Sequence, residues 1–163
     1  MDITYKKALF FSGLSSLSIL VSAFSLEIFA NLEPCQLCIL QRWPHLILVI
    51  LAFSGLFIIQ KNWILLLICF SAIITGIIGF YHVGVEQKWW SGPWGCSLRS
   101  ETEMDITSLT NLLLNTPVVK CDEIVWSLLG ISMAGWNSLT SFCIAFFAFF
   151  CWYRIMKNSR LNI

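Results

Sequence analysis

The sequence predicts an all-α integral membrane protein: a four-helix transmembrane bundle with a short amphipathic helix in its second outer loop. Of the 163 residues, 58% are hydrophobic and 12% are charged, and the mean hydropathy is +0.79, far from the balance of a soluble domain. Long uncharged runs recur along the chain. Because a helix rises about 1.5 Å per residue, about 20 such residues cross a hydrocarbon core of roughly 30 Å. We expect residues 1–163 to form one domain.

The first expected span covers residues 8–30, because the stretch from Ala8 to Leu26 contains no charged side chain. A cleaved signal peptide is the alternative, since Lys6 and Lys7 precede this stretch. The stretch is longer than the usual apolar region of a signal peptide, and no cleavage motif of small residues follows it. We therefore expect it to stay in the protein as a span.

The second span depends on an uncharged run from Leu46 to Ile59 that is short for a membrane crossing. An earlier start near Cys38 remains open, because a proline such as Pro44 is tolerated close to the start of a helix. The spans after the first are expected at 44–60, 63–85 and 138–154.

Small side chains recur at three- and four-residue steps in two spans, where they let membrane helices approach closely. A polar path through the membrane is the other interpretation of such stripes, and we favour helix packing. Tryptophans cluster near the span ends, as in an interfacial aromatic belt. The stripes are Ser15, Ser18, Ser22 and Ser25 in the first span, and Ala72, Gly76 and Gly79 in the third.

Basic residues set the expected orientation, because they concentrate on the cytoplasmic side of membrane proteins. They are dense in both terminal tails and in the tight turn near residue 61, but sparse in the loops 31–43 and 86–137. Both termini are therefore expected in the cytoplasm, and both loops outside it, where disulfides persist. The dense group is Lys6, Lys7, Lys61, Arg154, Lys157 and Arg160; the sparse group is Arg42, Lys88, Arg99 and Lys120.

The long outer loop is expected to contain the amphipathic helix, between Met104 and Asn115. Apolar residues recur there at helical spacing, and Pro117 follows the pattern. This helix lies either on the membrane surface or on top of the bundle. Its apolar positions are Ile106, Leu109, Leu112 and Leu113.

Four of the seven cysteines lie outside the apolar runs: Cys35 and Cys38 after the first span, and Cys96 and Cys121 in the long outer loop. Exposed thiols are reactive, and a membrane protein has no packing use for them. We therefore expect two dithiol/disulfide couples on one side of the membrane. If a helix begins after Leu37, its positive end and Arg42 would stabilise a thiolate at Cys38.

Two other uses of these cysteines remain open. The four can bind zinc, although Cys96 and Cys121 are not a close pair and reactive zinc thiolates are uncommon in oxidising compartments. Alternatively, Cys96 and Cys121 form a static structural disulfide. We expect no metal. No role is expected for the cysteines inside spans, which behave as small apolar residues: Cys69, Cys143 and Cys151.

The sequence Pro34-Cys35-Gln36-Leu37-Cys38-Ile39-Leu40-Gln41-Arg42-Trp43-Pro44 resembles the first outer loop of the disulfide bond formation protein B family, DsbB, quinone-dependent oxidases of the bacterial inner membrane. The resemblance extends over nearly the whole chain. One departure is Ala134-Gly135, where many relatives have a proline shortly before the last span. The other similar motifs are Tyr81-His82-Val83-Gly84-Val85-Glu86, Gly-Pro-x-Gly-Cys ending at Cys96, and Cys121-Asp122-Glu123 followed by Trp126 and Leu129-Gly130.

The resemblance implies a protein-dithiol:quinone oxidoreductase that sustains disulfide formation. Its partners would be a DsbA-like periplasmic thiol oxidase, the lipid bilayer and the membrane quinone pool, ubiquinone or menaquinone, with no nucleic acid. DsbA would attack Cys96, and the released Cys121 would attack Cys35. Cys38 would then be a free thiolate beside the quinone and Arg42. The physical reason for such a protein is that reduced DsbA is stabilised, so its reoxidation needs a respiratory acceptor.

His82, at the outer end of the third span, is a further expected quinone-binding residue. His45 and Glu27 are weaker candidates, and we expect Glu27 to face the membrane interface. Two alternative functions are kept. One is a quinone reductase of the vitamin K epoxide type that runs on thiols, and the other is a non-enzymatic membrane scaffold with a zinc or disulfide staple.

Overall fold

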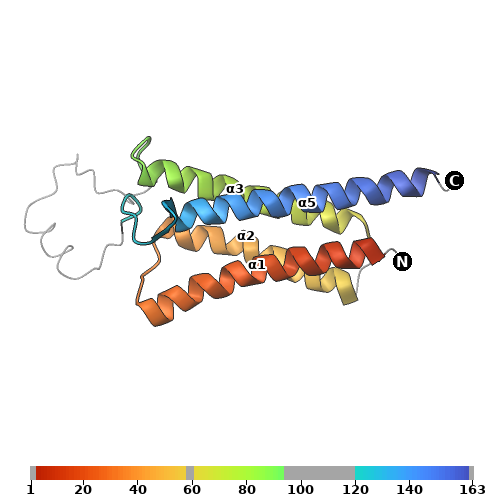
Figure 1. Cartoon of the computed structure of the whole chain (residues 1–163), viewed down its shortest axis with the longest axis horizontal. Coiled ribbons are helices and arrows are strands. Elements are labelled where there is room, and N and C mark those ends of the chain that lie inside the picture. Colours follow the sequence, from red (N-terminus) through yellow and green to blue (C-terminus); the bar gives the residue numbers. More distant parts are fainter. Residues whose placement is uncertain (1–2, 58–60, 94–119, 162–163) are drawn as a thin grey trace, which may run out of the picture.

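The chain folds into a bundle of long helices that lie side by side (Figure 1). The computed structural model describes residues 3–57, 61–93 and 120–161, so the expected helix at 104–115 lies outside the described residues. Four helices of the described part are long and apolar enough to span a membrane, which confirms the predicted fold class. The elements are α1 (Ile3–Ala30), α2 (Gln36–Phe57), α3 (Trp63–Glu86), β1 (Ser127–Leu128), β2 (Ile131–Ser132) and α5 (Met133–Leu161).

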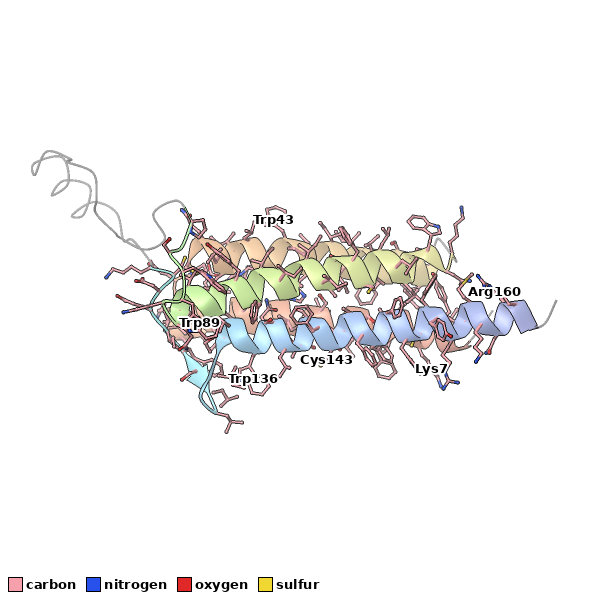
Figure 2. All side chains as sticks on the ribbon, turned by 90° about the horizontal axis from the view of Figure 1, so that it is seen from above. Lys7, Trp43, Trp89, Trp136, Cys143 and Arg160 are labelled. Carbon is pink, nitrogen blue, oxygen red and sulfur yellow. The ribbon has the colours of Figure 1, made fainter. Side chains whose placement is uncertain are left out.

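Both terminal segments lie at one end of the bundle, and the α1–α2 connection and the β hairpin lie at the other (Figure 1). Lys7 and Arg160 mark the first end, whereas Trp89 and Trp136 lie toward the second (Figure 2). The described cysteines outside the membrane-spanning segments, Cys35 and Cys121, are in the connections of this second end. The bundle therefore brings residues far apart in sequence to one end of the molecule.

Helix α2 begins at Gln36 rather than at residue 44, so the first outer connection is shorter than the expected loop 31–43. Pro44 lies inside the helix. The carbonyl of Pro44 accepts a 2.7 Å hydrogen bond from Ser71 of α3, which joins the two helices at this point. Cys38 and Arg42 are consequently part of a helix rather than of a loop.

The packing surface of α1 is not the serine stripe that the spacing suggested. Ser18 and Ser22 are exposed and donate to backbone carbonyls of their own helix, at 2.9 and 2.8 Å. Instead, Ser12 and Ser16 are buried, and a Cβ placed on Gly13 would lie 2.8 Å from that of Ala52 in α2. The serine stripe was the wrong face, because four-residue spacing alone does not say which side of a helix meets its neighbour.

The small residues of α3 do form a packing surface, as expected. Ala72 is fully buried, and α3 packs most extensively against α5. A Cβ on Gly79 would lie 3.2 Å from the backbone oxygen of Ala134 and from Ser138, and one on Gly76 would meet the ring of Phe142 at 3.1 Å. Glycine therefore permits the close approach of these two helices.

A two-residue hairpin leads into α5. Its strands pair Ser127 with Ser132, and Leu129 and Gly130 in the turn have φ angles of 55° and 78°, as a type I′ turn requires. Ser132 then caps α5, because its hydroxyl accepts the Gly135 N–H at 3.2 Å. A serine cap thus starts the helix just before Ala134-Gly135.

Candidate functional site

Cys35 and Cys38 lie together at the start of α2. Cys35 immediately precedes the helix, in the cap position, and its Sγ accepts the backbone N–H of Cys38 at 3.3 Å. The two sulfur atoms are 3.1 Å apart and within hydrogen-bond distance of each other, with both cysteines as free thiols. Cys35 is almost completely buried, whereas Cys38 is partly accessible. Such a pair needs only a small movement to close as a disulfide.

The charge of the reduced pair is centred on Cys35 rather than on Cys38, where the sequence suggested it. The hydrogen bond from the Cys38 thiol, with help from His82, lowers the pKa of Cys35 to about 4 against the opposing effect of burial. The backbone N–H of Cys38, in the first turn of α2, also donates to the sulfur of Cys35 and makes a smaller contribution in the same direction.

This pKa predicts an unusual pH profile for the reduced protein. Cys35 should remain a thiolate down to about pH 4, whereas an ordinary cysteine protonates below about pH 8.5. Labelling of Cys35 by methyl methanethiosulfonate, followed by peptide mass spectrometry, should stay constant from about pH 8 to about pH 5 and then fall. The shape of the profile reports the pKa even though burial slows the labelling. A midpoint near that of an ordinary thiol would contradict the assignment.

Cys121 lies in the same small buried cluster as Cys35. The other two buried members are Leu37 of α2 and Val85 of α3. It is 1% exposed and is disulfide-bonded. Cys96 lies outside the described residues. The structure thus brings three of the four predicted redox cysteines, Cys35, Cys38 and Cys121, to one end of the bundle.

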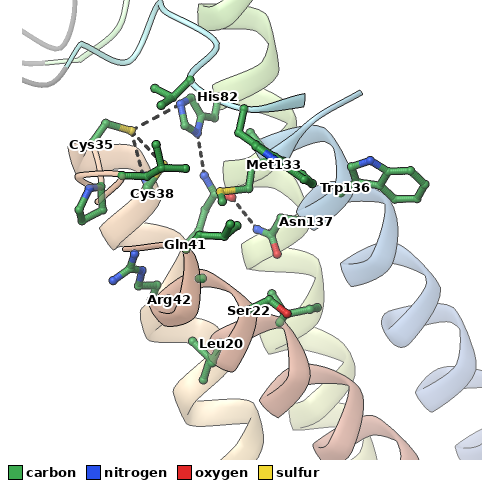
Figure 3. Close-up of a pocket in the computed structure, with 18 of the residues that line it drawn as sticks. Leu20, Ser22, Cys35, Cys38, Gln41, Arg42, His82, Met133, Trp136 and Asn137 are labelled. Carbon is green, nitrogen blue, oxygen red and sulfur yellow. Dashed lines mark hydrogen bonds between the residues drawn. The ribbon is translucent and has the colours of Figure 1, made fainter. Parts of the chain in front are cut away.

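A cavity of about 370 Å³ opens beside the cysteine pair, between α1, α2 and α5 (Figure 3). Apolar side chains such as Leu20 and Met133 form part of its wall, and Ser18 and Ser22 of α1 face it. Its polar lining includes Cys35, Cys38, Gln41, Arg42, His82 and Asn137. The cavity is large and apolar enough for a flat ring with a hydrocarbon tail.

Arg42 lies in the cavity wall but is already paired. Its Nη1 donates to Glu27 Oε2 of α1 at 2.6 Å, and its guanidinium lies 4.7 Å from the centre of the Phe24 ring. Glu27, which we expected to face the interface, is the partner of this cation, and its side chain is 35% exposed. The pair holds the positive charge at the membrane edge of the cavity, one helical turn from Cys38.

His82 joins the cysteine pair to the rest of the site. Its Nε2 lies 3.6 Å from Cys35 Sγ and 3.9 Å from Glu86 Oε1, and its Nδ1 lies 3.0 Å from Gln41 Nε2 (Figure 3). Glu86 also accepts a hydrogen bond from Ser132, the cap of α5. His82, Cys35 and Cys38 are the described group close enough together to bind a metal ion. This set differs from the Cys₄ zinc site considered above.

Two further polar residues near the site, Gln41 and Asn137, were not singled out from the sequence, and they contact the weaker candidate His45. Gln41 and Asn137 lie in apolar helices and hydrogen-bond each other, and Asn137 also contacts His45, which is buried between the helices. A polar side chain at membrane depth is expensive unless it is paired or functional. That cost is the signal that identifies Gln41, Asn137 and His45 as a set.

The cysteines inside the membrane spans are separate from this site. Cys69 and Cys151 are buried in the main hydrophobic core, and Cys143 is exposed near the middle of α5 (Figure 2). Their placement fits their expected role as small apolar residues.

Comparison with known proteins identifies the family. The family model for "Disulfide bond formation protein DsbB" matches residues 5–151. The "Disulfide bond formation protein B" of Xylella fastidiosa (strain 9a5c) is 34% identical over 129 residues, which are 73% of each chain. The protein of the same name from Verminephrobacter eiseniae is 28% identical over 146 residues, 85% of this chain and 81% of that one.

A protein of Rickettsia prowazekii (strain Madrid E) described as uncharacterised is 29% identical over 135 residues, 81% of this chain and 78% of that protein. No solved structure matches significantly. The family match covers the first three spans, most of the fourth, the cysteine pair and Cys121. The chain therefore belongs to the DsbB family and is a multi-pass membrane oxidoreductase of disulfide bond formation.

Proposed function

We propose that this protein oxidises a DsbA-like periplasmic dithiol protein and passes the two electrons to membrane quinone. The observation that carries the proposal is the buried cluster that contains both Cys35 and the disulfide-bonded Cys121. The adjoining cavity, with Cys38 and Arg42 in its wall, supports a lipid-soluble acceptor. The orientation that follows has both termini in the cytoplasm and the cysteines on the periplasmic side of the inner membrane.

The proposed first stage is a relay of disulfide exchanges. A thiolate of the reduced partner attacks Cys96 of a Cys96–Cys121 disulfide and releases Cys121 as a thiolate. Cys121 then attacks Cys35 of the oxidised Cys35–Cys38 pair, which releases Cys38 as a thiolate. Each exchange breaks one S–S bond and forms another, so no electrons leave the protein and partner together.

The second stage regenerates the loop disulfide. The partner's second thiol displaces Cys96, and the partner leaves as a disulfide. Cys96 then attacks Cys121 and restores their bond, which releases Cys35. The α2 pair now holds the two electrons as thiols. A free Cys35 and Cys38 beside a disulfide-bonded Cys121 is the cysteine state expected at this point.

The last stage returns the α2 pair to the disulfide. The residues of the cavity fit a quinone head group: Arg42 offers N–H donors, His82 lines the same cavity, and α1 and α5 supply apolar walls. When bound, a quinone would supply the capacity to take two electrons and two protons. Cys38 faces the cavity and would be the sulfur next to it, while Arg42 would favour negative charge there. Ubiquinone and menaquinone remain equal candidates.

A purified-protein assay tests this function. The protein in detergent should oxidise a reduced DsbA-like protein only when quinone is added, and one disulfide should form per quinone reduced. Oxidation without any quinone would contradict the proposal. Quinone reduction that runs only on thiols other than those of a DsbA-like protein would favour the activity of the vitamin K epoxide type. Bound metal with blocked thiols would favour the scaffold.

A further inference from the structure

A chain of buried polar side chains runs from Cys35 into the membrane-spanning part of the bundle. It passes from Cys35 Sγ to His82, Gln41, Asn137 and His45, with successive atom pairs 3.6, 3.0, 2.5 and 2.7 Å apart (Figure 3). His45 and Gln41 are 1% and 5% exposed. Three different helices contribute to the chain, and each amide or ring in it bridges two neighbours.

One backbone carbonyl fixes the hydrogen-bond direction beside Cys35. The oxygen of Leu37 only accepts, so the Gln41 atom that lies 3.1 Å from it is the amide nitrogen. The same nitrogen lies 3.0 Å from His82 Nδ1 and donates to it. A ring nitrogen that accepts carries no proton, so the ring proton of His82 is on Nε2. That N–H faces Cys35.

The direction continues on the other side of Gln41. The side-chain oxygen of Gln41, Oε1, can only accept. The Asn137 atom that lies 2.5 Å from it is therefore the amide nitrogen. Thr75 agrees with this assignment, because its hydroxyl donates to the Gln41 backbone oxygen and accepts from the same Asn137 nitrogen. Asn137 Oδ1 therefore faces His45 and accepts from its Nε2–H at 2.7 Å. At the end of the hydrogen-bond chain farthest from Cys35, Ser16 Oγ lies 2.8 Å from His45 Nδ1.

All donors in the chain consequently point the same way, toward Cys35. Hydrogen bonds aligned in series polarise one another, and the effect is larger where water is excluded. We propose that Gln41 is a positioning residue that holds His82 in the tautomer whose Nε2–H faces Cys35, and that Asn137 and His45 strengthen this N–H donor. The low pKa of Cys35 agrees in direction, since His82 is among its causes.

The hydrogen-bond chain from Cys35 to His45 determines which sulfur holds the negative charge at each stage of the relay. It makes Cys35 the sulfur that holds the charge while both thiols of the α2 pair are free. Once Cys35 is joined to another cysteine it can no longer do so, and the charge falls to Cys38, which faces the cavity. The inference rests on the proposed function only in treating the α2 pair as redox-active. A metal ion at Cys35, Cys38 and His82 would bind through the lone pair of His82 Nε2, but the hydrogen-bond chain requires a proton on that nitrogen.

Nitrogen NMR of the histidine rings tests the tautomer directly, in the reduced full-length protein in detergent without quinone or partner. The protein has two histidines, so the spectrum of the His45→Gln variant assigns the ring signals of both. We expect the wild-type His82 ring to carry its proton on Nε2. Gln41→Met keeps the side-chain length but removes the amide oxygen and nitrogen. The His82 ring in this variant should show a mixed or inverted tautomer. In the same variant, the midpoint of the Cys35 labelling profile should move to higher pH.

Two further variants make the test selective. Asn137→Leu should keep the His82 tautomer, because the Leu37 carbonyl still orients Gln41, but should raise the Cys35 midpoint by less than Gln41→Met does. Ser71→Ala loses an equally buried hydrogen bond to α2 outside the chain, and should change neither readout.

A wild-type His82 proton on Nδ1 would overturn the inference. So would unchanged tautomer and midpoint in Gln41→Met, or an equal change in Ser71→Ala. None of these results depends on electron transfer, so they leave the oxidase assay to decide the proposed function separately.

Discussion

Replacing Cys38 with serine is expected to reduce quinone-dependent oxidation of a DsbA-like protein to the rate seen without enzyme. Cys38 lies 3.1 Å from Cys35 and forms part of the cavity wall. Without its sulfur, the α2 pair cannot form the disulfide that Cys121 attacks in the proposed relay, so no electrons pass from the loop to α2. The measurement is the initial rate of partner oxidation at saturating quinone.

The same variant should also stop the relay at an identifiable stage. The Cys35 thiolate, with no Cys38 to pair with, is expected to attack Cys121 of the loop disulfide, which forms a Cys35–Cys121 bond and releases Cys96 as a thiolate. This bond should persist, because the Cys38 sulfur that would displace Cys121 from Cys35 is gone. Cys143→Ser is the matched control, since it changes an exposed cysteine in the span of α5 away from the site, and it should oxidise the partner at the normal rate. Normal turnover by Cys38→Ser would remove the α2 pair from the proposed path.

Replacing Arg42 with methionine is expected to lower turnover by about a hundredfold or more, the usual cost of losing one group that stabilises developing negative charge. Methionine keeps much of the apolar stem that packs in the cavity wall while removing the cation. The protein should still fold and keep its free Cys35 and Cys38. The rate of partner oxidation and the quinone concentration at half-maximal rate are the quantities to measure.

Glu27→Gln distinguishes the two roles open to Arg42. The 2.6 Å ion pair means that Arg42 acts either on the occupant of the cavity or only as a link between α1 and α2. If the cation acts in the cavity, Glu27→Gln keeps it there and should retain most of the activity. Equal losses in both variants would show that the helix link, and not the cation, is what the reaction needs.

The sequence was sufficient to predict the architecture and to find the cysteines. Uncharged runs indicate membrane helices because the bilayer excludes charge, and this signal does not depend on tertiary detail. The start of α2 was harder to predict, because Pro44 suggested a helix boundary. Pro44 instead lies inside the helix, and its carbonyl accepts a hydrogen bond from Ser71 of a different helix. No local sequence pattern reveals this contact.

The internal geometry of the site could not be predicted for a similar reason. Which cysteine holds the charge depends on the hydrogen bonds that Cys38 and His82 make to the sulfur of Cys35, and sequence periodicity does not resolve such contacts. The Arg42–Glu27 pair and the Gln41–Asn137 contact join residues from different helices. Such contacts follow from how the helices are rotated against one another. The sequence nevertheless contained a signal for them, since Gln41 and Asn137 are polar groups inside apolar spans.

The most direct test of the account is whether Cys35 and Cys121 can join. A protein with Cys38→Ser and Cys96→Ser keeps these two as its cysteines outside the membrane core. After mild oxidation in native membranes and blocking of free thiols, peptide mass spectrometry should find Cys35 linked to Cys121, because both lie in one buried cluster. Recovery of the two as separate blocked thiols, or their labelling from opposite faces of the membrane, would contradict the account.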